Sequence, residues 1–470
     1  MAKLSVDKAL LKAKSYAKKG EIEEAKKLYQ AVLQAFPKNK RAQQGLAALN
    51  KPRQPGTTQG PPQDAINQLI QLYNQGQLGA VVEQAQALTV QYPEAFIIWN
   101  IVGAANKGLG RVQAASKAFK RVTELNPTYA DGFNNLGVTL QDQGKLEEAI
   151  ASYNKALSLK PENVEFTENL QSLVVQLSPI MANYGHHFGT SKTQINSEIV
   201  LRPKYQIQNA IKAYLEADFG KTHSHNNNFK ACDRKLLDRL KPNDKVFCNA
   251  YSSFIGKLLD ANWDEEPASE NKVYHLGESH SLSYAHRNIT ISGSNLRITP
   301  RMTFGAKAFH FARSKYDSFK AITKAHLVSL PKNSKVFLSF GEIDCRPNEG
   351  FISAATKLDK PLEELIDQTT EGYVKWFLEQ NADLRHRLYF IGVPAPVYDK
   401  KLSADLNSEV ARAVALFNIE LKKYSLQHGY GTVDVFKFTV GKEGFSNGLF
   451  HIDNHHLGAN SLPEIEQQLS

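Results

Sequence analysis

The sequence has few of the features that mark secreted or membrane-spanning proteins. Its three cysteines, Cys232, Cys248 and Cys345, are too few for a disulfide framework and lack the spacing of metal ligands, as is typical of a reducing cytoplasm. No apolar run approaches the roughly 20 residues that span a bilayer. The N-terminal stretch MAKLSVDKALLKAKSYAKKG has helical periodicity and many lysines, but not the apolar segment of a signal peptide. We therefore expect a cytoplasmic protein with no membrane span.

Nucleic-acid-binding motifs are also lacking, although the formal net charge is +10. Lysines alternate with glutamates in the helical half, and we find no helix-turn-helix, zinc-finger or RNP-like pattern. The charge indicates a solvated surface with some attraction for acidic partners, so we expect no nucleic-acid partner. At 470 residues, of which 42% are hydrophobic, the chain exceeds one ordinary core, and we expect two or more domains.

Residues 130–163 repeat the pattern of the preceding 34 residues. Small and aromatic residues occupy equal offsets in the two copies, namely Phe133, Leu136, Gly137, Gly144, Ala149, Tyr153, Ala156 and Pro161 in one and Trp99, Val102, Gly103, Gly110, Ala115, Phe119, Val122 and Pro127 in the other. The spacing predicts two amphipathic helices per copy, with glycine in the turn and proline after the second helix. This pattern resembles the tetratricopeptide repeat, in which the aromatic positions are core residues.

Weaker copies extend the pattern toward the N-terminus. One ends at Pro93 and another occupies about residues 6–39, and the Pro/Gly/Thr-rich stretch NKPRQPGTTQGPP lies between them. The expected organisation, in chain order, is a first helical hairpin (1–49), a flexible linker (50–62), a repeat stack ending in a capping helix (63–178), and a connector or start of the next domain (179–270). The resemblance implies that a protein or peptide binds the concave surface of the stack, while a spacer or oligomerisation role stays open.

The region from residue 271 onward alternates strand and helix patterns. Short apolar runs predict strands at 273–276, 335–340, 387–393 and 432–436, and helical patterns occur at 361–381 and 406–429. The alternation predicts an α/β region with a parallel sheet and helices on both faces, a three-layer α/β/α architecture of the flavodoxin-like kind. Within the connector, residues 244–259 are expected to form a strand, a turn and a helix.

Polar residues follow two of the predicted strands, at the edge of the sheet where ligands bind. Glu278 and Ser279 come after the first run, and the sequence GEIDCR comes after the second. The stretch HIDNHHLGANS, at 451–461, follows the last run. Together these segments predict one site at the carboxyl ends of the strands.

This ordered set of motifs resembles the SGNH (GDSL-type) hydrolases over residues 271–470. Gly277-Glu-Ser corresponds to the Gly-Asp-Ser block of the family, and the stretch DNHHL corresponds to its final Asp-x-x-His block. The resemblance implies that Ser279 is the nucleophile, that His456 is the general base, and that Asp453 orients the imidazole. It also implies an oxyanion hole formed by the backbone N–H of Ser279 and a glycine N–H, for which Gly305 is the candidate.

The third family block, Gly-x-Asn-Asp, differs at one position of the segment 341–344. The residue that should donate its side-chain amide is Ile343, which has no side-chain donor. Arg346 is our candidate replacement, although it is equally suited to pair with Glu342 or Asp344. We expect Gly341, Glu342 and Asp344 to line the site together with Glu278, which keeps the charge of the family's aspartate.

Three competing interpretations are less favoured by the sequence. The segment 444–448 fits the G-x-S-x-G nucleophile elbow, but no helix-forming stretch follows Ser446. His451, Asp453 and His455 alternate along the chain, but no second ligand cluster accompanies them, so we expect no metal and no cofactor. His280 is adjacent to the nucleophile on a tight turn, and we expect it to point away from the site.

The sequence therefore leads to a serine esterase or acyltransferase joined to a repeat array. The resemblance suggests an ester-bearing substrate, with acetylated carbohydrate as one option. The alternative is an adaptor protein whose repeats bind a partner and whose SGNH-like domain has lost catalysis, which Ile343 favours.

Overall fold

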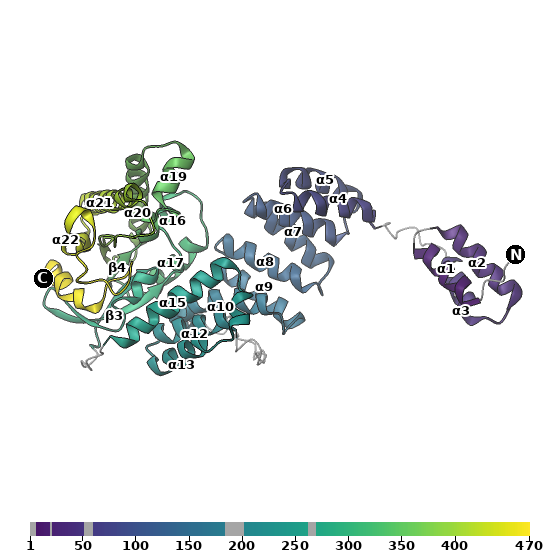
Figure 1. The fold of residues 1–470 in the computed structure, drawn as a ribbon, viewed down its shortest axis with the longest axis horizontal. Helices are drawn as coiled ribbons and strands as arrows, with labels where there is room; N and C mark the ends of the chain where they lie inside the picture. The colour runs from purple at the N-terminus through teal and green to yellow at the C-terminus, as the bar shows by residue number, and fades with distance from the viewer. Residues whose placement is uncertain (1–5, 19–20, 51–59, 184–201, 262–268) are drawn as a thin grey trace.

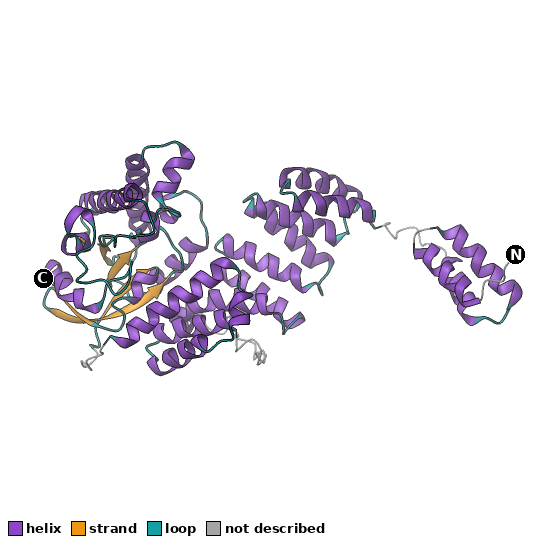
Figure 2. Cartoon of the chain, viewed as in Figure 1, coloured by secondary structure: helices purple, strands orange, loops and turns teal. Residues whose placement is uncertain are grey.

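The computed structural model describes residues 6–18, 21–50, 60–183, 202–261 and 269–470. A helical N-terminal part is followed by a region that contains all the strands of this described part of the chain (Figure 1, Figure 2). No helix within these ranges is both long and apolar enough to cross a membrane.

The N-terminal unit has three helices where the sequence predicted a hairpin. They are α1 (Val6–Lys18), α2 (Ile22–Ala35) and α3 (Lys40–Asn50). Leu10, Tyr29 and Val32 form its core, and Leu46 of α3 packs against them. The third helix was missed because only Ala42, Leu46 and Leu49 carry its apolar period. Most of the predicted linker, residues 51–59, lies outside the described residues.

Helices α4 to α10 form the repeat stack. Their bounds are α4 (Gln63–Asn74), α5 (Leu78–Gln91), α6 (Phe96–Gly108), α7 (Val112–Leu125), α8 (Ala130–Asp142), α9 (Leu146–Leu159) and α10 (Val164–Leu177). Phe119 and Tyr153 are buried in the core, and Gly103 and Gly137 lie directly against their rings, where a Cβ would approach ring carbons to 2.6–2.7 Å. Gly110 and Gly144 take left-handed φ values of 70° and 74° in the turns, a conformation that favours glycine.

Between the repeats and the sheet, the described residues form four helices and one short 3₁₀ turn. They are η1 (Ser178–Asn183), α12 (Pro203–Leu215), α13 (Phe219–Lys230), α14 (Arg234–Asp238) and α15 (Pro242–Asp260). Helix α15 corrects the prediction of a strand, a turn and a helix at 244–259. Pro242 starts the helix, and Phe247, Tyr251, Phe254 and Leu258 recur at i, i+4, i+7 and i+11 on one face. The helical period outweighs the local β-propensity of Val246 and Phe247.

The sheet has six strands in the order β2-β3-β1-β4-β5-β6. They are β1 (Lys272–Gly277), β2 (Asn288–Ile291), β3 (Ser294–Met302), β4 (Lys335–Ser339), β5 (Arg387–Ile391) and β6 (Gly431–Val433). All pairings are parallel except that of β2 with β3. The parallel strands, numbered along the chain, run 2-1-3-4-5 across the sheet, which is the flavodoxin-like order.

Two details of the sheet differ from the sequence prediction. The β2–β3 hairpin was not predicted, although Ser292 and Gly293 both have positive φ and form the two-residue turn that such hairpins prefer. The predicted strand at 432–436 ends at Val433, and helix α22 begins at Val435. Asp434 stops the strand because its side chain caps that helix by accepting from the backbone N–H of Lys437.

Helices cover both faces of the sheet. They are α16 (Ala308–Ala312), α17 (Ser318–Ser329), α18 (Glu342–Cys345), α19 (Phe351–Leu358), α20 (Leu362–Asn381), α21 (Ala404–Gln427), α22 (Val435–Thr439) and α23 (Leu462–Leu469). Leu276, Leu338 and Phe390 point to the face covered by α16, α20 and α21. Their neighbours Phe337 and Ile391 point to the opposite face, where α23 packs. This alternation places the sheet between two helical layers.

The repeats contact the α/β region directly. Ile322 of α17 is buried in the same core as Leu140 and Tyr153 of the last repeat. The backbone N–H of Phe304, after β3, donates to Oε1 of Gln176 in α10 at 2.8 Å. The loop that follows β3 is therefore anchored on the repeat stack.

Candidate active site

Ser279 lies where the strand order of the sheet reverses. Strand β1 ends at Gly277, and its neighbours β3 and β4 continue the sheet in opposite directions. Ser279 begins the short 3₁₀ turn η3 (Ser279–Leu282). Gly277 is required there, because a Cβ would come within 2.9 Å of the carbonyl oxygen of Ser339. The serine thus occupies the ligand-binding edge of a doubly wound sheet.

Ser279, His456 and Asp453 form a connected hydrogen-bonded chain. Nε2 of His456 lies 2.8 Å from Oγ of Ser279, and Nδ1 lies 2.9 and 3.0 Å from the two carboxylate oxygens of Asp453. Asp453 also accepts from the backbone N–H groups of His455 and His456, at 2.8 and 2.7 Å, which fix its position. Nucleophile, base and orienting acid therefore have the geometry that the resemblance implies. Their catalytic roles stay a prediction.

The electrostatic environment keeps His456 able to accept a proton. Burial lowers the pKa of His456, and the hydrogen bond that its Nδ1–H donates to Asp453 opposes that shift. Although burial favours the neutral form of Asp453, its bond to His456 holds its pKa below the usual range. The imidazole is consequently neutral at pH 7 beside an ionised carboxylate. This is the protonation state that a general base needs.

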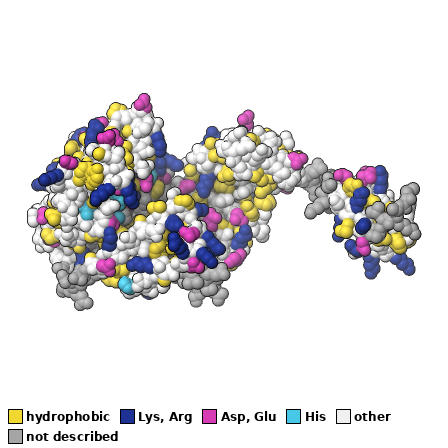
Figure 3. Space-filling model, in the orientation of Figure 1, with side chains coloured by type: hydrophobic (Ala, Val, Ile, Leu, Met, Phe, Trp, Pro, Cys, Tyr) yellow, Lys and Arg dark blue, Asp and Glu magenta, His cyan; other side chains and the backbone are white. Residues whose placement is uncertain are grey.

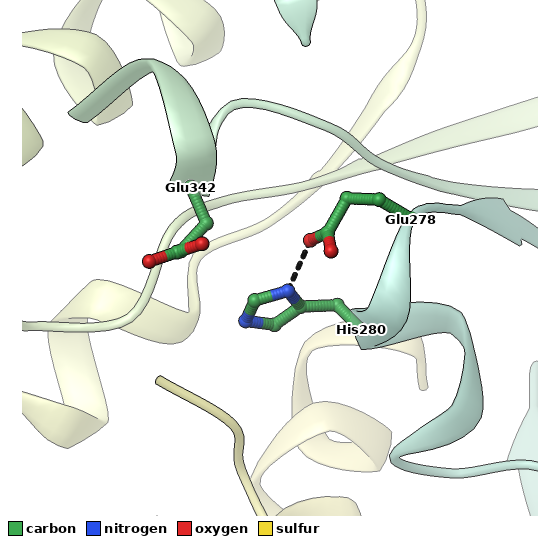
Figure 4. A group of neighbouring side chains, drawn as sticks. All are labelled: Glu278, His280 and Glu342. Carbon is green, nitrogen blue, oxygen red and sulfur yellow. Dashed lines mark hydrogen bonds and ion pairs between the residues drawn. The ribbon is translucent and has the colours of Figure 1, made fainter. Parts of the chain in front are cut away.

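A second buried group of charges adjoins the serine (Figure 4). Glu278 and His280 come from the turn after β1, and Glu342 begins α18 after β4. The carboxylate of Glu278 contacts Nδ1 of His280, and Nε2 of His280 donates to the carbonyl of His455 at 2.9 Å. His280 therefore points into the site, contrary to the sequence expectation. Its ring is held there because Nδ1 contacts Glu278 on the same 3₁₀ turn and Nε2 contacts the loop that carries His455. Although burial disfavours the imidazolium, Glu278 raises the pKa of His280 to about 9.

Arg346 pairs with Glu342 and is not directed at Ser279. Its Nε lies 3.0 Å from both oxygens of Glu342, and its Nη2 lies 2.7 Å from one of them. Nδ1 of His455 is 2.8 Å from the other oxygen. Although burial would raise the pKa of Glu342, Arg346 and His455 hold it well below its usual value. The pairing with Glu342, one of the two options left open by the sequence, is the one present in the structure.

The expected oxyanion hole is incomplete in this conformation. The backbone N–H and Oγ of Ser279 both contact the carboxylate of Glu278. Gly305 lies three residues beyond β3, is exposed, and has a left-handed φ of 63°. Ile343 is buried and supplies no donor.

Asp344 does not line the site, contrary to expectation. Its carboxylate accepts from the backbone N–H groups of Ala308 and Phe309, at 2.7 and 3.1 Å, and so caps the start of α16. Burial raises its pKa to about 7. Gly341 precedes α18 with a φ of 127° and lies against the ring of Phe417. Asp344 and Gly341 therefore have supporting roles, and within the segment 341–344 only Glu342 faces the site.

Glu278, His280 and Glu342 also have the composition of a metal-binding cluster. One ligand atom from each lies within 4.8 Å of the others. Carboxylate oxygens and an imidazole nitrogen would suit a divalent ion such as zinc or manganese. However, two cationic side chains, His280 and Arg346, already balance the two carboxylates. The cluster is electrostatically satisfied without an ion.

Two cavities border these charges. One of about 350 Å³ is lined by Glu278, His280, Glu342 and His275, with apolar walls from the ends of β5 and α22. A larger one of about 800 Å³ is lined by Arg346, His451, His455 and the apolar stretch 393–397. Histidine side chains are visible at a hollow in this face of the molecule, beside lysine and arginine side chains (Figure 3). A substrate could reach the charged cluster from the larger cavity.

The competing motifs have other partners in the structure. Oγ of Ser446 lies 2.8 Å from Nδ1 of His451, and no helix follows it as a nucleophile elbow would require. His451, Asp453 and His455 do not converge, because each bonds to a different group, namely Ser446, His456 and Glu342.

Sequence reasoning missed four residues around the site. Phe254 of α15 stacks on the imidazole of His456, with ring centroids 3.8 Å apart and an interplanar angle of 17°. The side chain of Tyr251, on the same helix, lies near that of Ser279. His275 and Ser339, on β1 and β4, bond to each other at 2.8 Å beneath the smaller cavity. The i, i+4, i+7 period of α15 was the one available signal.

Comparison with known proteins confirms three of the four predicted repeats. Models of the tetratricopeptide repeat match residues 9–39, 97–129 and 130–163. These segments correspond to α1–α2, α6–α7 and α8–α9. The chain therefore carries a repeat module of a kind that binds other proteins.

Curated relatives share only a short segment with this chain. The chain is 32% identical over 89 residues to "Essential for maintenance of the cell wall protein 1" of Saccharomyces cerevisiae. This matched segment covers 19% of this chain and 10% of that protein. The chain is 39% identical over 61 residues to human "Protein O-mannosyl-transferase TMTC2", covering 13% of this chain and 7% of that protein. The chain thus spans a tenth or less of the length of these relatives.

The solved structures that this chain matches include MamA and a Pseudomonas aeruginosa protein. MamA is 21% identical with a TM-score of 0.23, covering 39% of this chain and 87% of MamA. Pseudomonas aeruginosa pilF is 15% identical with a TM-score of 0.28, covering 52% of this chain and 96% of pilF.

Proposed function

We propose that the α/β region is an SGNH-type serine esterase or acyltransferase and that the repeats bind a protein or peptide partner. The observation that carries the proposal is the unbroken chain Ser279–His456–Asp453, at hydrogen-bonding distance in both links. The flavodoxin-like strand order and the position of Ser279 at the switch point of the sheet support it.

The chemistry follows from the geometry of the triad. Oγ of Ser279 attacks the ester carbonyl while Nε2 of His456 takes its proton, and the resulting imidazolium is stabilised by Asp453. His456 then gives that proton to the departing alcohol, which leaves an acyl group on Ser279. In the second step His456 activates either water, for hydrolysis, or an acceptor hydroxyl, for transfer. Acetylated carbohydrate is the substrate class that the family resemblance suggests.

The oxyanion must be stabilised by groups that are engaged elsewhere in this conformation. The backbone N–H of Ser279 would become available if substrate displaced the carboxylate of Glu278. Because removal of one oxyanion donor typically costs about 2.7–4 kcal/mol of barrier, the absence of a side-chain donor at Ile343 predicts a slow enzyme.

A direct test compares turnover of a small aryl acetate by the wild type and by two serine variants. Ser279→Ala should lose about 10³-fold or more in kcat. Ser446→Ala is the matched control, because Ser446 also bonds to a histidine but lies in the rejected motif, and it should keep wild-type turnover. A serine-reactive fluorophosphonate probe followed by peptide mass spectrometry should modify Ser279, which tests the nucleophile whatever the natural ester is.

The second candidate is a repeat-based adaptor with a non-catalytic α/β domain. It is favoured by the repeat matches, which establish only the interaction module, and by Ile343 at the donor position. Absence of both turnover and probe modification in the wild type would establish this alternative. If the probe modifies Ser279 in the wild type and this modification is lost when Asp453 is replaced, the adaptor alternative is excluded.

A further inference from the structure

Helix α15 belongs by sequence to the connector, yet its side chains reach the triad. Phe254 is 2% exposed and lies parallel to the imidazole of His456 at 3.8 Å between ring centroids. The ring of His280 lies 4.7 Å from the same imidazole. His456 is therefore in contact with an aromatic ring from the connector and with a histidine from the nucleophile turn.

The connector also packs on the turn that carries the serine. Leu282 and Ala285, just after Ser279, are buried in one core with Phe254, Ile255 and Leu258 of α15. Nε2 of His286 donates to the carbonyl of Tyr214 in α12 at 2.7 Å. Tyr251 interacts with Ser279, and its ring contacts Phe304 of the loop after β3 at 5.9 Å between centroids. The nucleophile turn thus lies between the sheet and the connector helices.

We propose that α15 is part of the catalytic site, with Phe254 as the positioning residue that fixes the imidazole of His456 between Ser279 and Asp453. This inference rests on the proposed function and extends it to a helix outside residues 271–470. A planar ring in contact with the imidazole restricts its rotation and excludes water from one face.

The arrangement has a consequence for the pH dependence of the reaction. Burial lowers the pKa of His456, and Phe254 provides much of the cover on one face of the ring. Of the charged groups around the imidazole, Asp453 and Glu278 raise this pKa and His280 lowers it, and all three are unchanged when Phe254 is replaced. Replacing it with a smaller, non-planar side chain admits water and returns that pKa toward its usual value. The acidic limb of the kcat/KM profile, which reports the proton uptake of the free base, then moves to higher pH.

The experiment is a pair of matched substitutions within one core. Phe254→Leu should lower kcat by about tenfold, with a smaller change in KM, and should move the acidic limb upward. Phe229→Leu makes the same chemical change in the same core. Phe229 lies on α13, is 5% exposed, and is not one of the rings that contact His456. This control substitution should lower the melting temperature to a similar extent and leave kcat and the pH profile per folded molecule unchanged.

The outcomes separate this inference from the proposed function. If the wild type hydrolyses an aryl acetate and both variants keep its kcat and its pH profile, α15 is only a structural cover and the inference is overturned. The same holds if both variants lose activity equally, because the loss then follows stability. If the wild type neither turns over ester nor reacts with a fluorophosphonate at Ser279, the proposed function fails and this inference falls with it. Loss of kcat and a shifted acidic limb in Phe254→Leu alone support it.

Discussion

Charged side chains are arranged in opposite ways in the repeats and around Ser279. In the repeats the ion pair between Lys160 and Asp131 joins side chains that are 46% and 40% exposed. Beside the serine, the side chains of Glu278 and His280 are only 2% and 11% exposed. Surface pairs contribute little to stability, whereas burying charges is expensive even when they are paired.

The difference supports the proposal that the repeats are shaped for stability and the α/β region for chemistry. The repeat core is built from apolar contacts such as those of Phe119 and Tyr153, with exposed charges outside. The α/β region instead concentrates ionised and pKa-shifted groups at one edge of its sheet, which is where functional sites are expected. Substitutions should therefore affect turnover in one region and stability in the other.

The largest expected effect is on catalysis, from Asp453→Asn. An asparagine Oδ1 can still accept from the backbone N–H groups of His455 and His456, so the loop should keep its shape. The amide cannot stabilise the imidazolium and favours the wrong tautomer of His456, which should lower kcat by about 10⁴-fold. Steady-state kinetics of the two proteins measure this effect.

A capping aspartate outside the site provides the control for that prediction. Asp434 accepts from the backbone N–H of Lys437 at the start of α22, and Asp434→Asn should leave kcat unchanged. The assignment of Asp453 to the triad would be contradicted if Asp453→Asn lost little kcat. It would also be contradicted if Asp453→Asn and Asp434→Asn lost kcat equally.

The two regions also differ in how much of them the sequence predicts. The repeats are local, because their period, their turn glycines and their aromatic positions all lie within 34 residues, and the predicted helices are present. The parallel sheet was inferred from the alternation of strand and helix patterns, and the proximity of Ser279 to His456 was inferred from motif order. Phe254, Tyr251 and the inward orientation of His280 were not predicted, because they depend on how α15 and the loop at His455 pack on the turn after β1.

A second prediction addresses the stability of the repeats. Phe119 of α7 is fully buried against Gly103 of α6, and Phe119→Ala removes its ring from the core of the stack. Such truncations typically cost about 3–5 kcal/mol of unfolding free energy. Denaturant unfolding followed by circular dichroism measures the loss, and turnover per folded molecule at low temperature should not change.

The control for that substitution is an exposed phenylalanine. Phe36, after α2, is 52% exposed, and Phe36→Ala should change the unfolding midpoint little. If Phe119→Ala instead reduced kcat in folded protein, the contact between Gln176 and Phe304 would couple the repeat core to the site, and the two regions would not be independent.

The smallest expected effect is a change of stability with pH that originates at the site. Because the folded-state pKa of His280 is raised to about 9, its pairing with Glu278 stabilises the fold fully below pH 6.5 and is lost as pH rises toward 9. The loss of unfolding free energy across this range should be at most about 3 kcal/mol. Denaturant unfolding of the wild type at several pH values measures it.

The double variant Glu278→Gln/His280→Gln removes both charges and leaves no unpaired ion behind. Its unfolding free energy should depend less on pH between 6.5 and 9 than that of the wild type, because the titrating imidazolium is gone. Single substitution of His280 is a poorer test, since it strands a buried carboxylate and destabilises the fold at every pH. Parallel pH curves for wild type and double variant would show that His280 is neutral in the folded protein. The contrast between buried charges at the site and solvated charges on the repeats would then rest on Arg346 and Glu342 alone.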